Sequence, residues 1–190
     1  TEEVIGGILM PGDGAADPSG VTHMLAKGAK MEGAQIFEKS PVDEILTKDG
    51  KISGVKVNGK KINCEYIVLA SGMWSRQIGE KAGVSIPLYP AEHFYIITEP
   101  IENLSKTLPV IRDFDNRTYI KEDAGKILVG IFEGDSIPAW NKTNRVPEDF
   151  SFGEFQENFE HFEPYLASAI KRFPVLETAG IRKFFSGPES

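Results

Sequence analysis

The segment Tyr66-Ile67-Val68-Leu69-Ala70-Ser71-Gly72-Met73-Trp74-Ser75 decides the expected fold. It begins as an apolar run, which stops at Ser71-Gly72 and is followed by a helical pattern. This order is typical of a buried central strand that leads into a tight turn. The glycine lets the backbone approach another group closely, and the next helix offers unpaired N–H groups at its start. The segment therefore predicts a turn that can hold a nucleotide.

The sequence before this segment predicts the rest of an α/β lobe. Residues 7–10 and 35–38 are short runs that predict strands, and residues 17–31 between them predict a helix that begins at a capping aspartate. A helix between two strands is typical of a βαβ crossover. Asp49-Gly50 and Asn58-Gly59 predict the two hairpin turns of a β-meander.

The second half of the chain predicts an antiparallel sheet and one long helix. The expected strands cover residues 88–98, 109–114, 117–121, 126–132 and 179–185. Phenylalanines at steps of three and four predict a helix over residues 152–173, with the phenylalanine stripe in the core. The fold class is therefore α+β or α/β. We expect one lobe over residues 1–86, a second over 87–178, and a return strand over 179–190.

Composition and charge exclude several classes of protein. The 190 residues have a net charge of −7, which argues against binding to nucleic acid or to an anionic membrane. No apolar run approaches the roughly 20 residues of a membrane helix, and from the polar, acidic first residues we expect no signal peptide. Three histidines and the single Cys64 form no metal-binding pattern. We expect no nucleic-acid, membrane or metal partner, and no secretion.

We interpret the chain as an internal piece of a longer polypeptide. It does not begin with Met, and it ends on Ser-Gly-Pro-Glu-Ser. Neither Gly-x-Gly-x-x-Gly nor Gly-Lys-Ser/Thr occurs in it. If a dinucleotide is bound, its main phosphate-binding element is therefore expected outside these residues.

Several motifs, in order along the chain, resemble one family of flavoproteins. They are Pro11-Gly12-Asp13-Gly14, Asp17-Pro18, Leu25-Ala26-Lys27-Gly28-Ala29, Ala70-Ser71-Gly72-Met73-Trp74-Ser75-Arg76, His93-Phe94-Tyr95-Ile96-Ile97-Thr98, Leu108-Pro109-Val110-Ile111-Arg112-Asp113, Thr118-Tyr119 and Phe185-Ser186-Gly187-Pro188-Glu189-Ser190. The chain resembles the dimethylglycine and sarcosine dehydrogenases over essentially its whole length. These are FAD-dependent oxidoreductases with a D-amino-acid-oxidase-like fold. The resemblance implies part of an FAD-binding, Rossmann-like lobe and a mainly antiparallel substrate-binding sheet with flanking helices.

The resemblance implies an activity as well as a fold. The expected reaction is oxidation of an N-methylated glycine-type amine, dimethylglycine or sarcosine, by hydride transfer to FAD. The main FAD anchors, and a C-terminal domain that would bind tetrahydrofolate, are implied outside this chain. The chain alone is therefore expected to be inactive, and its exposed surface favours self-association. The implied location is the cytoplasm for a bacterial protein and the mitochondrial matrix for a eukaryotic one.

Two other functions stay open. The regulatory subunit of pyruvate dehydrogenase phosphatase shares the expected architecture and serves as a non-catalytic interaction module. An amine oxidase of the same fold with another substrate is the second alternative. The presence of both His93 and Tyr119 favours an enzyme.

The resemblance marks His93 and Tyr119 as the catalytic pair, on adjacent strands of the sheet. A neutral amine is the better hydride source, and a histidine, with an ordinary pKa of about 6.5, is suited to accept its proton. From the sequence alone, His93 is equally well explained as a packed histidine on the same strand face as Tyr95. Arg112 and Arg117 are candidates to bind a substrate carboxylate, and Tyr95 is a candidate to line the pocket.

The resemblance also implies contacts with FAD at Val42, Ala70, Ser71, Gly72, Trp74, Asp13 and Gly14. Val42 is implied at the adenosine part, and the Ser71-Gly72 turn at the pyrophosphate or ribose. Asp13-Gly14 would approach the flavin ring, and Trp74 would pack near it. An ordinary turn at Asp13-Gly14 and a core tryptophan at position 74 remain the plainer interpretations.

Overall fold

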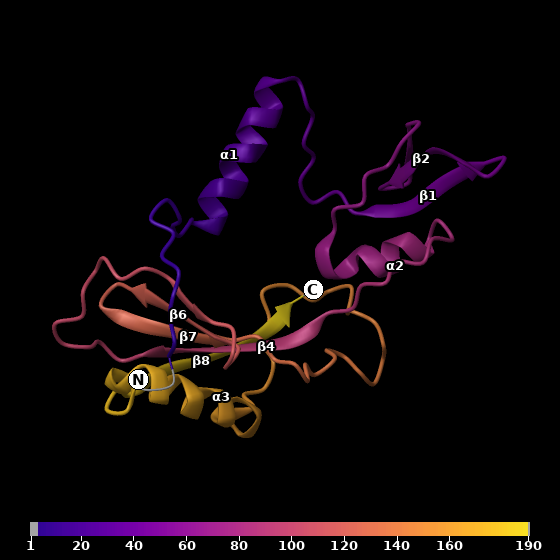
Figure 1. The fold of residues 1–190 in the computed structure, drawn as a ribbon. Coiled ribbons are helices and arrows are strands. Elements are labelled where there is room, and N and C mark those ends of the chain that lie inside the picture. The colour runs from indigo at the N-terminus through magenta and orange to yellow at the C-terminus, as the bar shows by residue number, and fades with distance from the viewer. Residues whose placement is uncertain (1–3, 190) are drawn as a thin grey trace. The chain divides into compact units, whose positions relative to one another are not determined.

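The computed structural model describes residues 4–189, which form two compact units (Figure 1). One unit spans residues 16–89, and the other joins residues 4–15 to residues 90–189. Each unit contains one antiparallel sheet. No helix among the described residues is long and apolar enough to cross a membrane.

The unit of residues 16–89 combines a helix, a three-stranded meander and a short helical segment. Its elements are α1 (Pro18–Met31), β1 (Val42–Lys48), β2 (Lys51–Val57), β3 (Lys60–Asn63), the 3-10 helix η1 (Gly72–Trp74) and α2 (Ser75–Glu80). The side chain of Asp17 caps α1 by accepting a hydrogen bond from the backbone of Ser19. Asp49-Gly50 and Asn58-Gly59 adopt the positive φ angles that tight hairpin turns require. The predicted meander is therefore confirmed.

The three strands expected on either side of α1 and before η1 are not formed. Residues 7–10, 35–38 and 66–70 have no strand partner in the part of the chain that the structure describes. A parallel strand exists only within a sheet, where neighbouring strands satisfy its backbone and helices cover its side chains. Here Ile8 is 94% exposed and Val68 is 90% exposed. The predicted βαβ crossover is wrong for this structure, because an apolar run does not itself supply a neighbouring strand.

The second unit is built on a five-stranded antiparallel sheet. Its elements are β4 (Ala91–Thr98), β5 (Ile111–Asp113), β6 (Thr118–Asp123), β7 (Lys126–Ile131), α3 (Phe159–Arg172), the 3-10 helix η2 (Pro174–Leu176) and β8 (Ile181–Glu189). The strand order is β5-β6-β7-β4-β8. Strand β4 thus lies between β7 and the C-terminal strand. The predicted antiparallel sheet is confirmed, with a last strand that extends beyond the predicted end at residue 185.

Pleating gives this sheet two chemically different faces. The even-numbered residues Phe94 and Ile96 of β4 are buried with Val129 of β7. Helix α3 adds Phe162 and Ala169 to the same core, and Figure 1 shows it running along the sheet. Because successive side chains of a strand point to opposite faces, the odd-numbered residues of β4 lie on the face away from α3.

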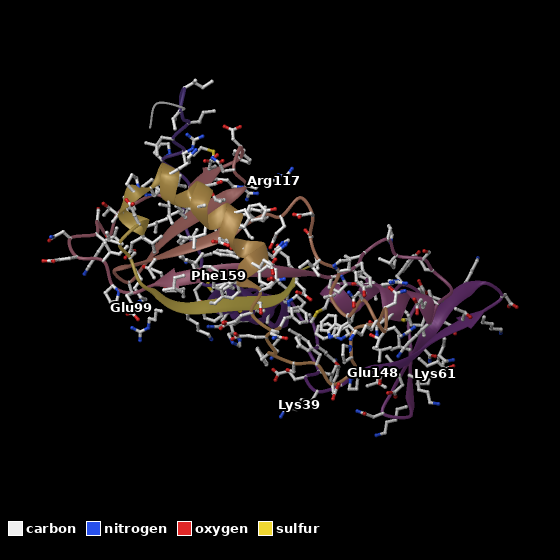
Figure 2. All side chains as sticks on the ribbon, turned by 90° about the horizontal axis from the view of Figure 1, so that it is seen from below. Lys39, Lys61, Glu99, Arg117, Glu148 and Phe159 are labelled. Atoms are coloured by element: carbon white, nitrogen blue, oxygen red, sulfur yellow. The ribbon has the colours of Figure 1, made fainter. Side chains whose placement is uncertain are left out.

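Helix α3 begins at Phe159, later than the predicted start at residue 152 (Figure 2). The residues before it are not helical. Phe152, for example, has a φ of 49°, which lies outside the helical range, and its side chain is fully exposed. The backbone N–H of Phe155 donates to the carbonyl of Ser186 at 3.0 Å, and the Ser186 hydroxyl donates back at 2.6 Å. The side chain of Asn158 then caps the helix. Pairing with β8 and the cap override the phenylalanine periodicity in this segment.

Candidate active site

His93 of β4 and Tyr119 of β6 contact each other across the intervening strand β7. The Nε2 atom of His93 lies 3.2 Å from the hydroxyl oxygen of Tyr119, and the planes of the two rings differ by 6°. The sequence placed them on adjacent strands, which is wrong, because β7 lies between β4 and β6. The structure nevertheless brings the predicted pair within hydrogen-bonding distance. Their catalytic role stays a prediction.

Gly130 of β7 gives Tyr119 the room to reach His93. It is the register partner of Tyr95 on one side and of Tyr119 on the other. A Cβ atom at position 130 would overlap the Tyr119 ring. The ring therefore lies directly over glycine backbone. Gly130 was not singled out from the sequence, although a glycine inside a strand is itself a signal for such a close approach.

Two carboxylates face the other ring nitrogen of His93. Its Nδ1 atom lies 3.4 Å from Oε2 of Glu133 and 3.3 Å from Oε2 of Glu189. An ionised carboxylate only accepts hydrogen bonds, so these partners assign a proton to Nδ1. The Nε2 atom of the neutral ring then accepts the hydroxyl hydrogen of Tyr119. Neither glutamate was singled out from the sequence, where each is one acid among many.

Burial and charge separate the pKa values of His93 and Tyr119. Burial lowers the pKa of His93, but the hydrogen bond with Glu133 and the charges of Glu189 and Glu133 outweigh it. The pKa of His93 therefore lies above its ordinary value. Burial, followed by the charge of Glu189 and smaller contributions, raises the pKa of Tyr119 to about 12. Tyr119 thus keeps its hydroxyl proton at neutral pH, while His93 is the member that exchanges one.

Phe132 connects this pair to Arg112. Its ring centroid lies 5.8 Å from that of His93 and 5.2 Å from that of Tyr119. The guanidinium carbon of Arg112 lies 3.8 Å from the Phe132 centroid and 5.3 Å from that of Phe114. A guanidinium stacked on a ring is held in position while its N–H donors lie in its own plane. Arg112, the register partner of Tyr119, therefore presents a cation beside the pair.

The other two predicted substrate residues lie in different surroundings. Tyr95 lies two positions after His93 on β4 and stacks on Phe185 of β8, with ring centroids 4.6 Å apart. Arg117 (labelled in Figure 2) has a φ of 54°, and its guanidinium packs against Gly134. Its charge there contributes to the lowered pKa of Asp135, after the larger effect of a hydrogen bond from Tyr165. The structure thus groups Arg112, and not Arg117, with His93.

The predicted cofactor residues fall into the two units. Val42 and residues 70–74 belong to the unit of residues 16–89, whereas Asp13-Gly14 belongs to the other. The ammonium of Lys81 donates to the carbonyls of Val42 at 3.2 Å and Asp43 at 3.1 Å, which ties the start of β1 to the end of α2. In the exposed Asp13-Gly14 turn, the aspartate accepts a hydrogen bond from the glycine N–H at 2.8 Å.

The turn at Ser71-Gly72 has the form that close approach of a ligand requires. Gly72 has a φ of 51°, and open space lies where a Cβ atom would stand. The hydroxyl of Ser71 lies 3.3 Å from that of Ser75 at the start of α2. Trp74 is half-buried, and Ala70 is exposed. These features fit a group, such as the pyrophosphate or ribose of a dinucleotide, that packs against backbone.

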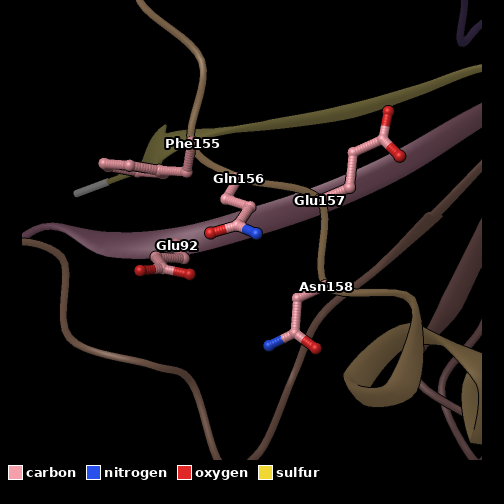
Figure 3. A pocket seen from close by; sticks show the side chains of 5 residues that line it. All are labelled: Glu92, Phe155, Gln156, Glu157 and Asn158. Atoms are coloured by element: carbon pink, nitrogen blue, oxygen red, sulfur yellow. The ribbon is translucent and has the colours of Figure 1, made fainter.

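A depression in the second unit lies away from His93. It is lined by Glu92, Phe155, Gln156, Glu157 and Asn158 (Figure 3). Glu92 precedes His93 on β4, so its side chain lies on the opposite face of the sheet. Burial raises the pKa of Glu92, and the charge of His161 opposes this shift.

His161, near the start of α3, is half-buried. Its ring packs against Phe94 and Tyr165, with centroid distances of 5.6 and 6.1 Å, and its Nε2 atom is buried. Within residues 4–189, no group of three or more His, Cys, Asp or Glu side chains is arranged to hold a metal ion.

The family model described as FAD dependent oxidoreductase (DAO) matches residues 1–190. The chain belongs to this family. The resemblance drawn from the sequence motifs is therefore confirmed, and so is the dependence of the family on FAD.

Relatives of this oxidoreductase chain cover its whole length. It is 38% identical over 187 residues to 4-methylaminobutanoate oxidase (formaldehyde-forming) of Paenarthrobacter nicotinovorans. The aligned region covers 98% of this chain and 22% of the relative. It is 34% identical to human mitochondrial sarcosine dehydrogenase, over 100% of the chain and 21% of the relative. It is also 34% identical to the mouse mitochondrial pyruvate dehydrogenase phosphatase regulatory subunit, over 99% of this chain and 21% of the relative. The chain spans about a fifth of the length of these relatives.

The solved structures agree with the predicted fold class. L-proline dehydrogenase from P. horikoshii superimposes with a TM-score of 0.71 at 26% identity, over 91% of this chain and 43% of that one. The mixed α/β architecture with antiparallel sheets is therefore that of FAD-dependent oxidoreductases.

Substitution of Gly130 tests whether its missing side chain makes room for Tyr119. Gly130→Ala is expected to lower the free energy of unfolding by about 1–3 kcal/mol, because the added methyl group forces the Tyr119 ring to move. Gly187→Ala on β8 is the matched control, since nothing lies close to where its Cβ atom would stand, and a change within about 0.5 kcal/mol is expected. Urea unfolding measures both. Equal losses in the two variants would contradict this role of Gly130.

Proposed function

We propose that the full-length protein uses FAD to oxidise N-methylated amino acids, with hydride leaving the N-methyl carbon. The observation that supports this most directly is the 3.2 Å approach of His93 Nε2 to the Tyr119 hydroxyl. A histidine with carboxylates at its second nitrogen is suited to accept a proton from an amine. The odd-numbered face of β4 is the part of this chain where we propose that the substrate binds.

The names of the relatives support a substrate class. Sarcosine and 4-methylaminobutanoate, taken from the names of two relatives above, each combine an N-methylated amine with a carboxylate. L-proline, named for the structural neighbour, is likewise a secondary amine with a carboxylate. We therefore propose that the substrate is an N-methylated amino carboxylate. In sarcosine and dimethylglycine, the amine and the carboxylate are separated by the shortest distance in this class.

The proton must leave the substrate ammonium before hydride transfer, because the nitrogen lone pair drives the hydride out. In neutral His93, Nε2 accepts the hydroxyl hydrogen of Tyr119. Tyr119 can thus take a proton from the ammonium while it passes its own proton to Nε2. The positive charge that forms on His93 is stabilised by Glu133 and Glu189. The substrate leaves as the iminium ion after it has lost one proton and one hydride.

Arg112 is our candidate for the carboxylate of the substrate. It lies opposite Tyr119 in the β5–β6 register and stacks on Phe132, which also contacts His93. A guanidinium binds a carboxylate through two parallel hydrogen bonds. A substrate held by Arg112 at one end would bring its amine towards Tyr119.

FAD supplies the acceptor for the hydride. We propose that the unit of residues 16–89 contacts FAD through Val42 at its adenosine part, through the Ala70-Ser71-Gly72 turn at its pyrophosphate or ribose, and through Trp74 near the flavin. The open turn at Gly72 supports the pyrophosphate or ribose contact. Contact of Asp13 and Gly14 with the flavin ring stays a prediction. Tetrahydrofolate binding by a further domain, the cellular compartment and the inactivity of the isolated chain stay predictions.

The alternative is a non-catalytic role like that named for the regulatory-subunit relative. The half-buried, charge-paired histidine favours catalysis, because such an arrangement costs folding free energy and perturbed titratable groups cluster at functional sites. The visible spectrum of the full-length protein separates the two. A flavin band that bleaches anaerobically with an N-methylated amino acid supports the enzyme, and a folded, colourless protein contradicts it.

Removal of His93 tests the proton acceptor. His93→Ala is expected to slow anaerobic flavin reduction by the best N-methylated amino acid at least about 100-fold, because Tyr119 then loses its proton acceptor Nε2. His23→Ala on the exposed side of α1 is the control and is expected to keep the wild-type rate. Stopped-flow absorbance of the flavin measures both, and an unchanged rate in His93→Ala removes His93 from the mechanism.

The two arginines test the carboxylate site. Arg112→Gln is expected to raise the substrate concentration needed for half-maximal flavin reduction about tenfold or more, because a charge-assisted bidentate contact is lost. Arg117→Gln is the matched control, since that guanidinium packs against Gly134 instead. If Arg117→Gln has the larger effect, the assignment of the carboxylate to Arg112 is wrong.

A further inference from the structure

Glu133 combines deep burial with an unsatisfied oxygen. Its side chain is 3% exposed, and the residue lies two positions after the end of β7. Its Oε2 atom faces His93 Nδ1 at 3.4 Å, while its buried Oε1 atom has no hydrogen-bond partner among residues 4–189. A buried carboxylate without full pairing is costly to fold. A group retained under those conditions points to a function at the neighbouring imidazole.

The second carboxylate at His93 is of a different kind. Oε2 of Glu189 lies at a similar distance, 3.3 Å, but the Glu189 side chain is 56% exposed. An exposed charge is screened by water and salt, whereas a buried charge acts at a lower effective dielectric constant. Glu133 is therefore the stronger and better fixed partner of Nδ1.

We propose that Glu133 is the positioning residue of His93: it holds the proton on Nδ1 and leaves Nε2 free to accept from Tyr119. The inference rests on the proposed function, because it concerns the same proton acceptor. With the opposite tautomer, Nε2 would carry a hydrogen and could not accept the Tyr119 proton. Glu133 also compensates the charge of the imidazolium that forms when the substrate proton arrives.

The charged and titratable groups that face His93 come from three elements. Glu133 follows β7, Glu189 lies on β8, and Tyr119 lies on β6. Of these, the glutamates raise the pKa of His93 against the opposing effect of burial. Since the base is active when neutral, flavin reduction is expected to accelerate as the pH rises through this raised pKa. Loss of the Glu133 charge lowers the pKa, so the accelerating limb moves to lower pH.

The test compares Glu133→Gln with Glu189→Gln in the full-length protein. Histidine labelled with ¹³C at Cε1 reports the titration of His93, whose signal is assigned by its loss in His93→Ala. Glu133→Gln is expected to move this titration to lower pH. Glu189→Gln is expected to move it in the same direction by a smaller amount, and mainly at low salt, because salt screens the exposed Glu189 charge. The flavin-reduction limb is expected to shift in parallel, with a maximal rate about tenfold lower in Glu133→Gln. Glu133→Met is a second neutral variant in case the glutamine variant does not fold.

The outcomes separate the two proposals. An unmoved His93 titration in the Glu133 variants, or an equal shift in Glu189→Gln, overturns the role of Glu133. A loss of thermal stability without a shift in either pH profile shows a structural role and also overturns it. If the wild-type flavin is not reduced by any N-methylated amino acid, the proposed function fails. The NMR titration still decides the assignment of Glu133 in that case.

Discussion

The pleat of β4 is the constraint on which the candidate site depends. This strand lies between β7 and β8, so neighbours on both sides fix it. Its even-numbered residues Phe94 and Ile96 are buried in the core with α3, and that burial holds the odd-numbered His93 on the other face. A register slip of one residue would expose Phe94 and bury His93 under α3. The hydrophobic core therefore sets the orientation of the proposed proton acceptor.

On this frame, two strands and one loop position supply a short chain of polar groups. Glu133 follows β7, His93 lies on β4, and Tyr119 reaches from β6 over the bare backbone of Gly130. Each contact depends on the one before it, because a carboxylate at Nδ1 decides what Nε2 can accept. Phe132 extends the arrangement to Arg112, which adds a cation for an acidic substrate group. A proton acceptor and a carboxylate binder are thus held on one sheet face.

Local patterns and long-range contacts differ in how far the sequence reveals them. The meander, the sheet strands and the cap of α1 follow from turn residues and periodicity, and the structure confirms them. The strand expected at residues 66–70 failed, because the neighbouring strand that it needs is not specified by its own apolar run. The early start expected for α3 failed because Phe155 pairs with Ser186, a contact distant in sequence. Motif resemblance found His93 and Tyr119, whereas Glu133 and Gly130 required the strand order.

The central claim is that His93 and Tyr119 act as one proton-transfer unit. A double-mutant cycle on the rate of anaerobic flavin reduction, with His93→Ala, Tyr119→Phe and the double variant, tests it most directly. If the two residues act as a unit, the double variant is expected to be about as slow as the slower single variant. Rate losses that multiply in the double variant would show independent roles and contradict the account.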